Sequence, residues 1–307
     1  MKLGIIGGAG ALGATTAFHV AAGGLMSEII LYDLKDNVAK SHAMDIEQAV
    51  CDFSETKLRT GALSELAECE IILNTAGVPE RVVKSRDEFL AGNIEILNGL
   101  AAEIRAWGTS PVIVSATNPI DVLNYKFFEM ACLPAERFVG FCRNDTLRFK
   151  WAAAAETGIP AQQLDAMVIG EHGDGQIPIF SSLRQISTGE PLKLSSVQRE
   201  SILARVKTWF GNYQSLDAGR SSGWTSGVGL YQLIAMIALD NAAGGSEVIP
   251  CSVIPNGHYG LRNLSIGLPV RLGPGGVAEI VNINLSDEER GALHSAADKI
   301  QNAIKSC

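Results

Sequence analysis

Short apolar runs alternate with longer amphipathic stretches through the first half of the chain. The apolar runs predict buried strands, and the amphipathic stretches predict helices. Strands are expected at 3–6, 28–32, 57–60, 70–74, 111–115 and 138–141, and helices at 11–22, 37–50, 64–68, 88–107 and from Asp121 onward. Strands that alternate with helices in this way predict a parallel sheet with right-handed crossover connections.

The second half of the chain has a less regular pattern. Helices are expected at 145–157, 195–213, 227–241 and 286–305, where Ser286 begins a capping box, and strands at 167–169, 248–253, 264–270 and 279–283. The closely spaced strands and turns predict an antiparallel element. We therefore expect an α/β protein with two domains, in which residues 1–144 form a Rossmann-type, doubly wound parallel sheet and residues 145–307 form an α+β domain.

The first predicted strand ends in a glycine-rich turn, Gly7-Gly8-Ala9-Gly10-Ala11-Leu12-Gly13. Glycines let backbone N–H groups and the N-terminus of the next helix approach a bound pyrophosphate, which side chains would block. Asp33 ends the second strand, at the distance where a dinucleotide fold places a carboxylate on the adenosine ribose. The alternative is an ordinary strand–turn–helix with a helix-capping acid. Because a carboxylate repels a 2′-phosphate, the pattern predicts NAD rather than NADP.

The amino-acid composition excludes several classes of binding partner. The net charge is −8 and the pI about 5.2, which gives no electrostatic footprint for nucleic acid or for an anionic membrane. The six cysteines have no spacing typical of a metal site, so we expect reduced thiols and no metal. No apolar run is left to span a membrane, and Met1-Lys2 leads directly into the first strand without a signal peptide. We therefore expect a cytoplasmic protein.

His172 is the histidine most suited to acid–base chemistry. It lies between Gly170 and Gly173, directly after a predicted strand, where glycines let the backbone expose the imidazole toward a cleft. An imidazole titrates near neutral pH and can exchange a proton with a substrate oxygen. The alternative is an ordinary histidine on a surface loop.

Two residues of the helix predicted at 145–157 could act with this histidine. Asp145 and Arg148 are three positions apart, so their side chains lie on adjacent faces of one helical turn. Asp145 could bind the far imidazole nitrogen and stabilise the cation, and Arg148 could hold a carboxylate by a planar two-point contact. The alternative is an N-cap aspartate within a surface ion pair.

Five sequence windows, taken in order, resemble the NAD-dependent lactate/malate dehydrogenase family over essentially the whole chain. These windows are the glycine turn with Asp33, residues 75–79, residues 116–123 with Asn118-Pro119, residues 145–149, and Ile169-Gly170-Glu171-His172-Gly173-Asp174. The resemblance implies NAD as cofactor and a 2-hydroxy or 2-oxo carboxylic acid as substrate.

The resemblance also implies roles for individual residues. His172 resembles the family's proton donor and acceptor, Asp145 its orienting partner, and Arg148 the arginine that binds the substrate carboxylate. Arg86 resembles the arginine of the loop that closes over the substrate and polarises its carbonyl, and Asn118 the asparagine at the substrate oxygen. The implied cofactor-binding residues are Gly7, Gly10, Leu12, Gly13, Asp33, Ala76, Gly77, Asn93 and Asn118.

The chain departs from the family where the substrate tail is recognised. The discriminating position falls on Glu80, whereas malate enzymes of the family have arginine there and lactate enzymes have glutamine. Glu80 should repel a second carboxylate and favour a tail that is hydroxylated, cationic or absent. Alternatively the loop shifts by one residue and Arg81 takes the malate role; a lactate dehydrogenase is the next possibility. A rival of another class is a catalytically silent NAD-binding protein.

Three further expectations concern the surroundings of this site. Residues 223–227 resemble a small-residue loop in which Thr225 lines the pocket, and Trp224 packs near the pocket or in the core. Arg143 has no counterpart in the family. Residues 41–46 resemble a family segment near a subunit contact; the alternative is that their apolar face packs in the core. Because oligomers are usual in the family that the chain resembles, we expect a homodimer or homotetramer that binds a small molecule and neither nucleic acid nor membrane.

Overall fold

The computed structural model describes residues 1–78, 86–218, 222–239 and 247–307, apart from the side chains of residues 86–88. Its N-terminal half contains the strands β1 (Lys2–Ile6), β2 (Glu28–Tyr32), β3 (Lys57–Thr60), β4 (Ile71–Asn74), β5 (Val112–Ser115) and β6 (Phe138–Gly140). All neighbouring pairs are parallel, and the spatial order is β3-β2-β1-β4-β5-β6. This is the strand order of a dinucleotide-binding fold, so the predicted Rossmann-type sheet is confirmed.

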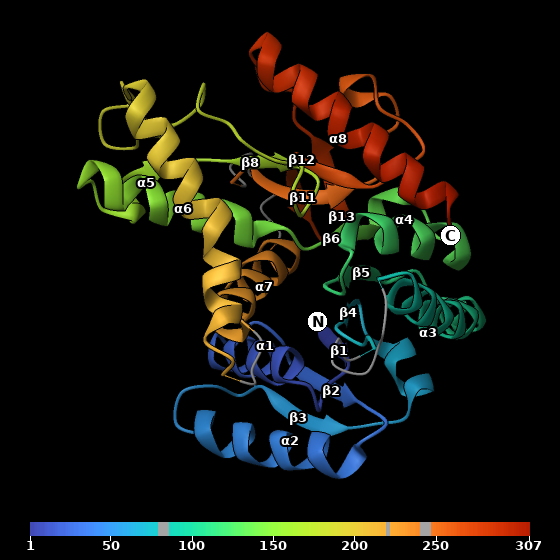
Figure 1. Cartoon of the computed structure of the whole chain (residues 1–307). Helices are drawn as coiled ribbons and strands as arrows, with labels where there is room; N and C mark the ends of the chain where they lie inside the picture. The colour runs from blue at the N-terminus through green and yellow to red at the C-terminus, as the bar shows by residue number, and fades with distance from the viewer. Residues whose placement is uncertain (79–85, 219–221, 240–246) are drawn as a thin grey trace.

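Helices cover both faces of this sheet (Figure 1). They are α1 (Ala11–Ala22), α2 (Asp36–Val50), α3 (Arg86–Trp107) and α4 (Ile120–Ala131), with the short 3₁₀ helix η1 (Leu63–Glu68). Successive side chains of each strand point to opposite faces of the sheet. Ile71 and Leu73 pack in the core that contains α1 and α2, whereas Ile72 packs on the other face with α3 and α4. The strands are buried on both sides, which explains their nearly continuous apolar sequences.

The second half extends the same sheet with antiparallel strands. These are β8 (Val168–Gly170), β9 (Gln176–Pro178), β11 (Ile249–Val253), β12 (Ile266–Gly273) and β13 (Gly276–Ile280), and β7 (Leu164–Asp165) pairs separately with β10 (Arg184–Gln185). Ser252 of β11 pairs with Gly140 of β6, so one continuous sheet of eleven strands runs through the described part of the chain. The predicted antiparallel element is confirmed.

The remaining helices lie around this extension. They are α5 (Arg143–Thr157), α6 (Ser196–Ser215), α7 (Gly223–Ala238) and α8 (Asp287–Lys305). The division into residues 1–144 and 145–307 stays a prediction, and it falls in the first turn of α5.

The loop expected at residues 223–227 is wrong, since this segment forms the start of α7. A Cβ at Gly227 would lie 2.4 Å from Thr15 Cγ2 of α1, so this glycine permits two helices to approach closely. Trp224 is 66% exposed, which excludes the core position considered for it within this chain.

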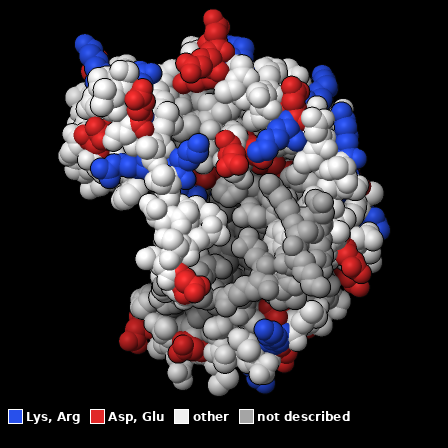
Figure 2. Space-filling view, viewed as in Figure 1, with Lys and Arg blue, Asp and Glu red and all other residues white. Residues whose placement is uncertain are grey.

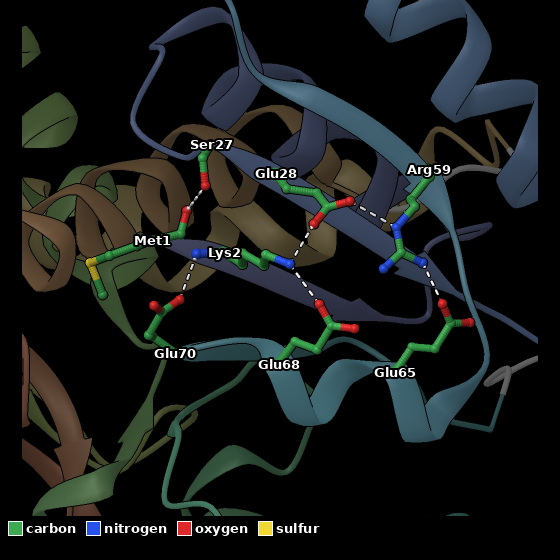
Figure 3. Close-up of polar contacts among 8 residues, drawn as sticks. All are labelled: Met1, Lys2, Ser27, Glu28, Arg59, Glu65, Glu68 and Glu70. Carbon is green, nitrogen blue, oxygen red and sulfur yellow. Dashed lines mark hydrogen bonds and ion pairs between the residues drawn. The ribbon is translucent and has the colours of Figure 1, made fainter.

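A network of charged side chains joins three parallel strands to η1 (Figure 3). Lys2 Nζ lies 3.0 Å from Glu28 and 2.6 Å from Glu68, and Arg59 lies 2.8 Å from Glu28 and 2.6 Å from Glu65. The hydrogen bonds from Arg59 and Lys2 hold the pKa of Glu28 below its usual value. Lys2 and Glu28 begin β1 and β2, so the centre of the network lies at the ends of these strands opposite the glycine turn.

Basic and acidic side chains are interspersed on the face shown in Figure 2. None of the described helices combines the length and the apolar content needed to cross a membrane. The described residues also contain no group of three or more His, Cys, Asp or Glu side chains that could hold a metal ion.

Candidate active site

The glycine turn after β1 is packed against its neighbours too closely for side chains. Gly7 has a φ of +89°, and a Cβ there would lie 2.5 Å from Thr75 Oγ1. A Cβ at Gly13 would lie 2.4 Å from the carbonyl oxygen of Gly7. The turn therefore stays tight and leads directly into α1, whose first N–H groups have no acceptor within the helix. This cradle of backbone N–H groups fits a pyrophosphate.

Asp33 lies beside this turn, as its position after β2 requires. One carboxylate oxygen accepts a hydrogen bond from the N–H of Ala9 at 3.0 Å, and the other accepts one from the N–H of Lys35 at 2.9 Å. Each carboxylate oxygen keeps a second lone pair for a ligand hydroxyl. The carboxylate and the glycine turn thus fit the adenosine side of NAD.

The ends of the central strands are joined to one another by side chains. Thr75 Oγ1 donates to the carbonyl of Ile6 at 2.9 Å, and Thr117 Oγ1 donates to the carbonyl of Ala76 at 2.7 Å. A Cβ at Gly77 would lie 2.7 Å from Thr117 Cγ2, so the absence of a side chain keeps these segments in contact. The predicted crevice is therefore lined by three adjoining strand ends.

Asn93 of α3 links the next two segments. Its Oδ1 accepts from the N–H of Val78 at 2.8 Å, and its Nδ2 donates to the carbonyl of Asn118 at 3.3 Å. The Asn93 side chain is buried, whereas Asn118 is exposed. Asn93 therefore holds the backbone of this edge, and the Asn118 amide stays accessible from solvent.

Asp121 in the first turn of α4 connects the two halves of the site. It is 3% exposed, and its carboxylate accepts hydrogen bonds from the backbone N–H of His172 at 2.7 Å and from Ser252 Oγ at 2.5 Å. Burial raises the pKa of Asp121 to about 6, although both hydrogen bonds oppose the rise. A buried carboxylate thus fixes the backbone of the histidine turn to the Asn118 side of the crevice.

His172 and Asp145 form a short polar contact at this site. His172 Nδ1 lies 2.6 Å from Asp145 Oδ2, and their side chains are only 16% and 6% exposed. With Nδ1 occupied, Nε2 is the nitrogen that can exchange a proton with a ligand. Burial lowers the pKa of His172, but the charge and hydrogen bond of Asp145 and the charge of Asp121 outweigh it, so the pKa lies above its usual value.

Arg148 lies one turn after Asp145 on α5. Its Nη1 is 3.5 Å from Asp145 Oδ1, its guanidinium carbon lies 4.4 Å from the ring centre of Trp209, and its buried Nε has no hydrogen-bond partner among the described residues. Burial lowers the pKa of Arg148, and Asp145 opposes this effect. A buried guanidinium with an unused N–H is suited to a bidentate contact with a ligand carboxylate.

The structure thus brings His172, Asp145 and Arg148 into one cluster. Thr225 lies partly buried in the first turn of α7 rather than in a loop. Glu80 and Arg81 lie outside the described residues, as does the side chain of Arg86, whose backbone begins α3.

Arg143, which has no family counterpart, is also accounted for. It is 8% exposed; its Nε donates to Gln232 of α7 at 2.7 Å, and its Nη2 lies 3.5 Å from Glu247. Its side chain therefore joins α5 to α7 and to the segment before β11.

Sequence reasoning missed three residues of this region. Asp121 follows the strand-end segment 116–119, so its position gave a usable signal. Ser252 and Trp209 gave none, because a strand serine and a helix tryptophan are unremarkable until distant elements come together.

Two family models match nearly the whole chain. The NAD binding domain of lactate/malate dehydrogenase matches residues 1–140, and the lactate/malate dehydrogenase alpha/beta C-terminal domain matches residues 143–307. The chain is 30% identical over 302 residues to malate dehydrogenase of Halobacterium salinarum, with 97% of each chain covered.

Solved structures agree with these matches. The malate dehydrogenase of Salinibacter ruber is 28% identical, with a TM-score of 0.90 over 99% of this chain and 97% of that one. A minor L-lactate dehydrogenase of Enterococcus mundtii is 23% identical, with a TM-score of 0.91 over 99% of this chain and 98% of that one, which shows the common fold. With the glycine turn, Asp33 and both family models in agreement, this chain belongs to the NAD-dependent lactate/malate dehydrogenase family of oxidoreductases.

Proposed function

We propose that this chain interconverts a 2-hydroxy and a 2-oxo carboxylic acid, with His172 as the acid–base group. The observation that carries the proposal is the 2.6 Å contact between His172 and Asp145, next to Arg148 with its unused Nε–H. When NAD is bound, its nicotinamide supplies or accepts the hydride. The proton that accompanies the hydride then passes between His172 Nε2 and the substrate oxygen.

Each neighbour of His172 has a separate part in this proposal. Asp145 orients the imidazole and stabilises its cation, and Arg148 binds the substrate carboxylate. Arg86 stabilises the charge that develops on the carbonyl oxygen, and Asn118 donates a hydrogen bond at the same atom. The proposed contacts to NAD come from Gly7, Gly10, Leu12, Gly13, Asp33, Ala76, Gly77, Asn93 and Asn118.

The substrate tail is proposed from the loop sequence. Glu80 at the discriminating position favours a 2-oxo acid whose tail is hydroxylated, cationic or absent, over oxaloacetate. Malate dehydrogenation with Arg81 facing the substrate is the second candidate, and it is favoured by the similar proteins of Halobacterium salinarum and Salinibacter ruber, which are named malate dehydrogenases. Thr225 is proposed to contact the tail from α7.

We also propose a cytoplasmic homodimer or homotetramer. All six cysteines are free thiols, which suits a reducing compartment. Large apolar side chains are exposed on α1 and α7, which pack together: Phe18 is 40% exposed, Trp224 66% and Val228 38%. Neighbouring exposed apolar residues of this kind are typical of an interface.

Turnover of 2-oxo acids should depend on the imidazole. We expect NADH oxidation, followed by absorbance with pyruvate, oxaloacetate and branched, aromatic, hydroxylated and amine-bearing 2-oxo acids, to fall at least about 100-fold in His172→Asn. Asparagine fills similar space but cannot carry the proton. The control is His294→Asn, a change on α8 away from the cluster, which should leave turnover unchanged.

The substrate panel separates the candidates. A preference for hydroxylated or cationic tails supports the Glu80 assignment, and efficient oxaloacetate turnover supports malate dehydrogenation. Binding of NADH without turnover of any 2-oxo acid would contradict the proposal and favour a silent NAD-binding protein.

Removing the buried charge of Asp121 should change the pH dependence of 2-oxo acid reduction. Asp121→Asn keeps an acceptor for the His172 N–H but removes the negative charge that raises the pKa of His172. The imidazolium then loses its proton at lower pH. In a plot of kcat/KM against pH, the fall in rate on the basic side, which we call the basic limb, should therefore move to lower pH. We expect about a tenfold loss on the alkaline side of the wild-type limb.

Ser265→Ala is the matched control, because Ser265 belongs to the same buried network but carries no charge. It should lower stability by about 1 kcal/mol and leave the limb in place. If the basic limb of the kcat/KM profile lies at the same pH in Asp121→Asn and in the wild type, the charge of Asp121 does not raise the pKa of His172.

A charge on the exposed face of α7 should break the proposed assembly. We expect light scattering after size exclusion to give a multiple of 32.6 kDa for the wild type and 32.6 kDa for Val228→Asp, since burying a carboxylate in an interface is costly. Val197→Asp, at an exposed valine on α6, should keep the wild-type mass. A monomeric wild type would refute the assembly.

A further inference from the structure

The guanidinium of Arg148 is held more by an aromatic ring than by polar partners. Its ion contact with Asp145 is long, at 3.5 Å, and its Nε–H is buried without an acceptor among the described residues. The ring of Trp209 lies 4.4 Å from the guanidinium carbon. An arginine over a tryptophan is the most favourable cation–π pair, particularly where water is excluded.

Trp209 is itself held firmly on α6. Tyr213, one turn later, stacks on it with ring centres 5.3 Å apart and an interplanar angle of 12°. Earlier on α6, Ser201 Oγ donates to Glu156 of α5 at 2.7 Å, and Ile202 packs in a core shared with α5. The packing of α6 on α5 therefore fixes where the Trp209 ring meets Arg148.

Asp145 has two competing partners, and the geometry favours one of them. It lies 2.6 Å from His172 but 3.5 Å from Arg148. A guanidinium free to turn would close that gap, because two short hydrogen bonds to a carboxylate are stronger than one long contact. Such closure would use the N–H groups that a substrate carboxylate needs and would neutralise the charge that stabilises the His172 imidazolium.

We propose that Trp209 is a positioning residue that keeps Arg148 off Asp145 and available to the substrate carboxylate. The inference rests on the proposed function, in which Arg148 binds that carboxylate. Through this one contact, Trp209 affects substrate binding and proton transfer. It keeps the Arg148 guanidinium available to the substrate carboxylate, and it leaves the charge of Asp145 to stabilise the His172 imidazolium.

The proposal involves a defined set of charged and titratable groups around His172. They are Asp145 and Arg148 from α5, Cys142 at its N-cap, Asp121 from α4, Glu171 from the histidine turn, and Lys299 of α8, which pairs with Glu171. Arg148 is the member of this set whose charge lies over the Trp209 ring.

Substitution of Trp209 should weaken substrate binding and shift the pH profile together. We expect Trp209→Ala to raise the KM of the preferred 2-oxo acid about tenfold, to leave the Kd of NADH unchanged, and to move the basic limb of kcat/KM to lower pH. Trp209→Phe, with a weaker cation–π ring, should be intermediate. Trp151→Ala, at a half-exposed tryptophan on α5, should match the wild type.

A double substitution tests whether Trp209 acts through the guanidinium. Arg148→Lys keeps the charge but removes the planar fork, so Trp209→Ala should change KM less than twofold in that background. The same tenfold change in both backgrounds, or an unshifted pH limb in Trp209→Ala, would overturn the proposal.

A binding measurement separates this inference from the proposed function. Oxamate, a 2-oxo acid analogue that accepts no hydride, should quench Trp209 emission in the NADH complex, seen as the difference between wild type and Trp209→Phe. Equal quenching in both proteins would overturn the role of Trp209, even where turnover is normal. Quenching without turnover of any 2-oxo acid would support Trp209 and refute the proposed reaction.

Discussion

A carboxylate buried beside an imidazole stabilises the imidazolium only while both groups are held in place and water is kept away. Asp145 meets these conditions from the first turn of α5, and His172 meets them from a turn whose backbone is fixed by Asp121. The two acids come from different helices, so the site exists only when both halves of the chain have folded together. The rest of the structure serves this placement.

The continuous sheet explains how that placement is achieved. The parallel strands bring the glycine turn, Asp33 and the Asn118 segment to one edge, and the antiparallel strands continue from β6 and place the histidine turn beside it. Ser252 contributes both to the pairing of the strands and to the polar network of the site. Its backbone pairs with β6, and its hydroxyl donates a hydrogen bond to Asp121. Strand pairing and the buried polar network therefore stabilise the same junction.

Local patterns were sufficient for much of this account. The parallel sheet followed from alternating strands and helices, and the choice of His172 followed from its flanking glycines. The loop predicted at residues 223–227 is a helical turn instead, because glycines that allow two helices to pack closely have the same sequence signature as glycines in a loop. Trp209 could not be found from sequence, since its contact with Arg148 depends on how two helices cross, which no local pattern encodes.

The most direct measurement of the central claim is the pKa of His172, followed by NMR of ring-labelled histidine in the wild type and in Asp145→Asn. If the buried carboxylate stabilises the imidazolium, the wild-type pKa will lie above that of an ordinary histidine, and the pKa in the variant will lie clearly below the wild-type value. The same pKa in both proteins would show that Asp145 does not stabilise the cation, and the account of the site would fail.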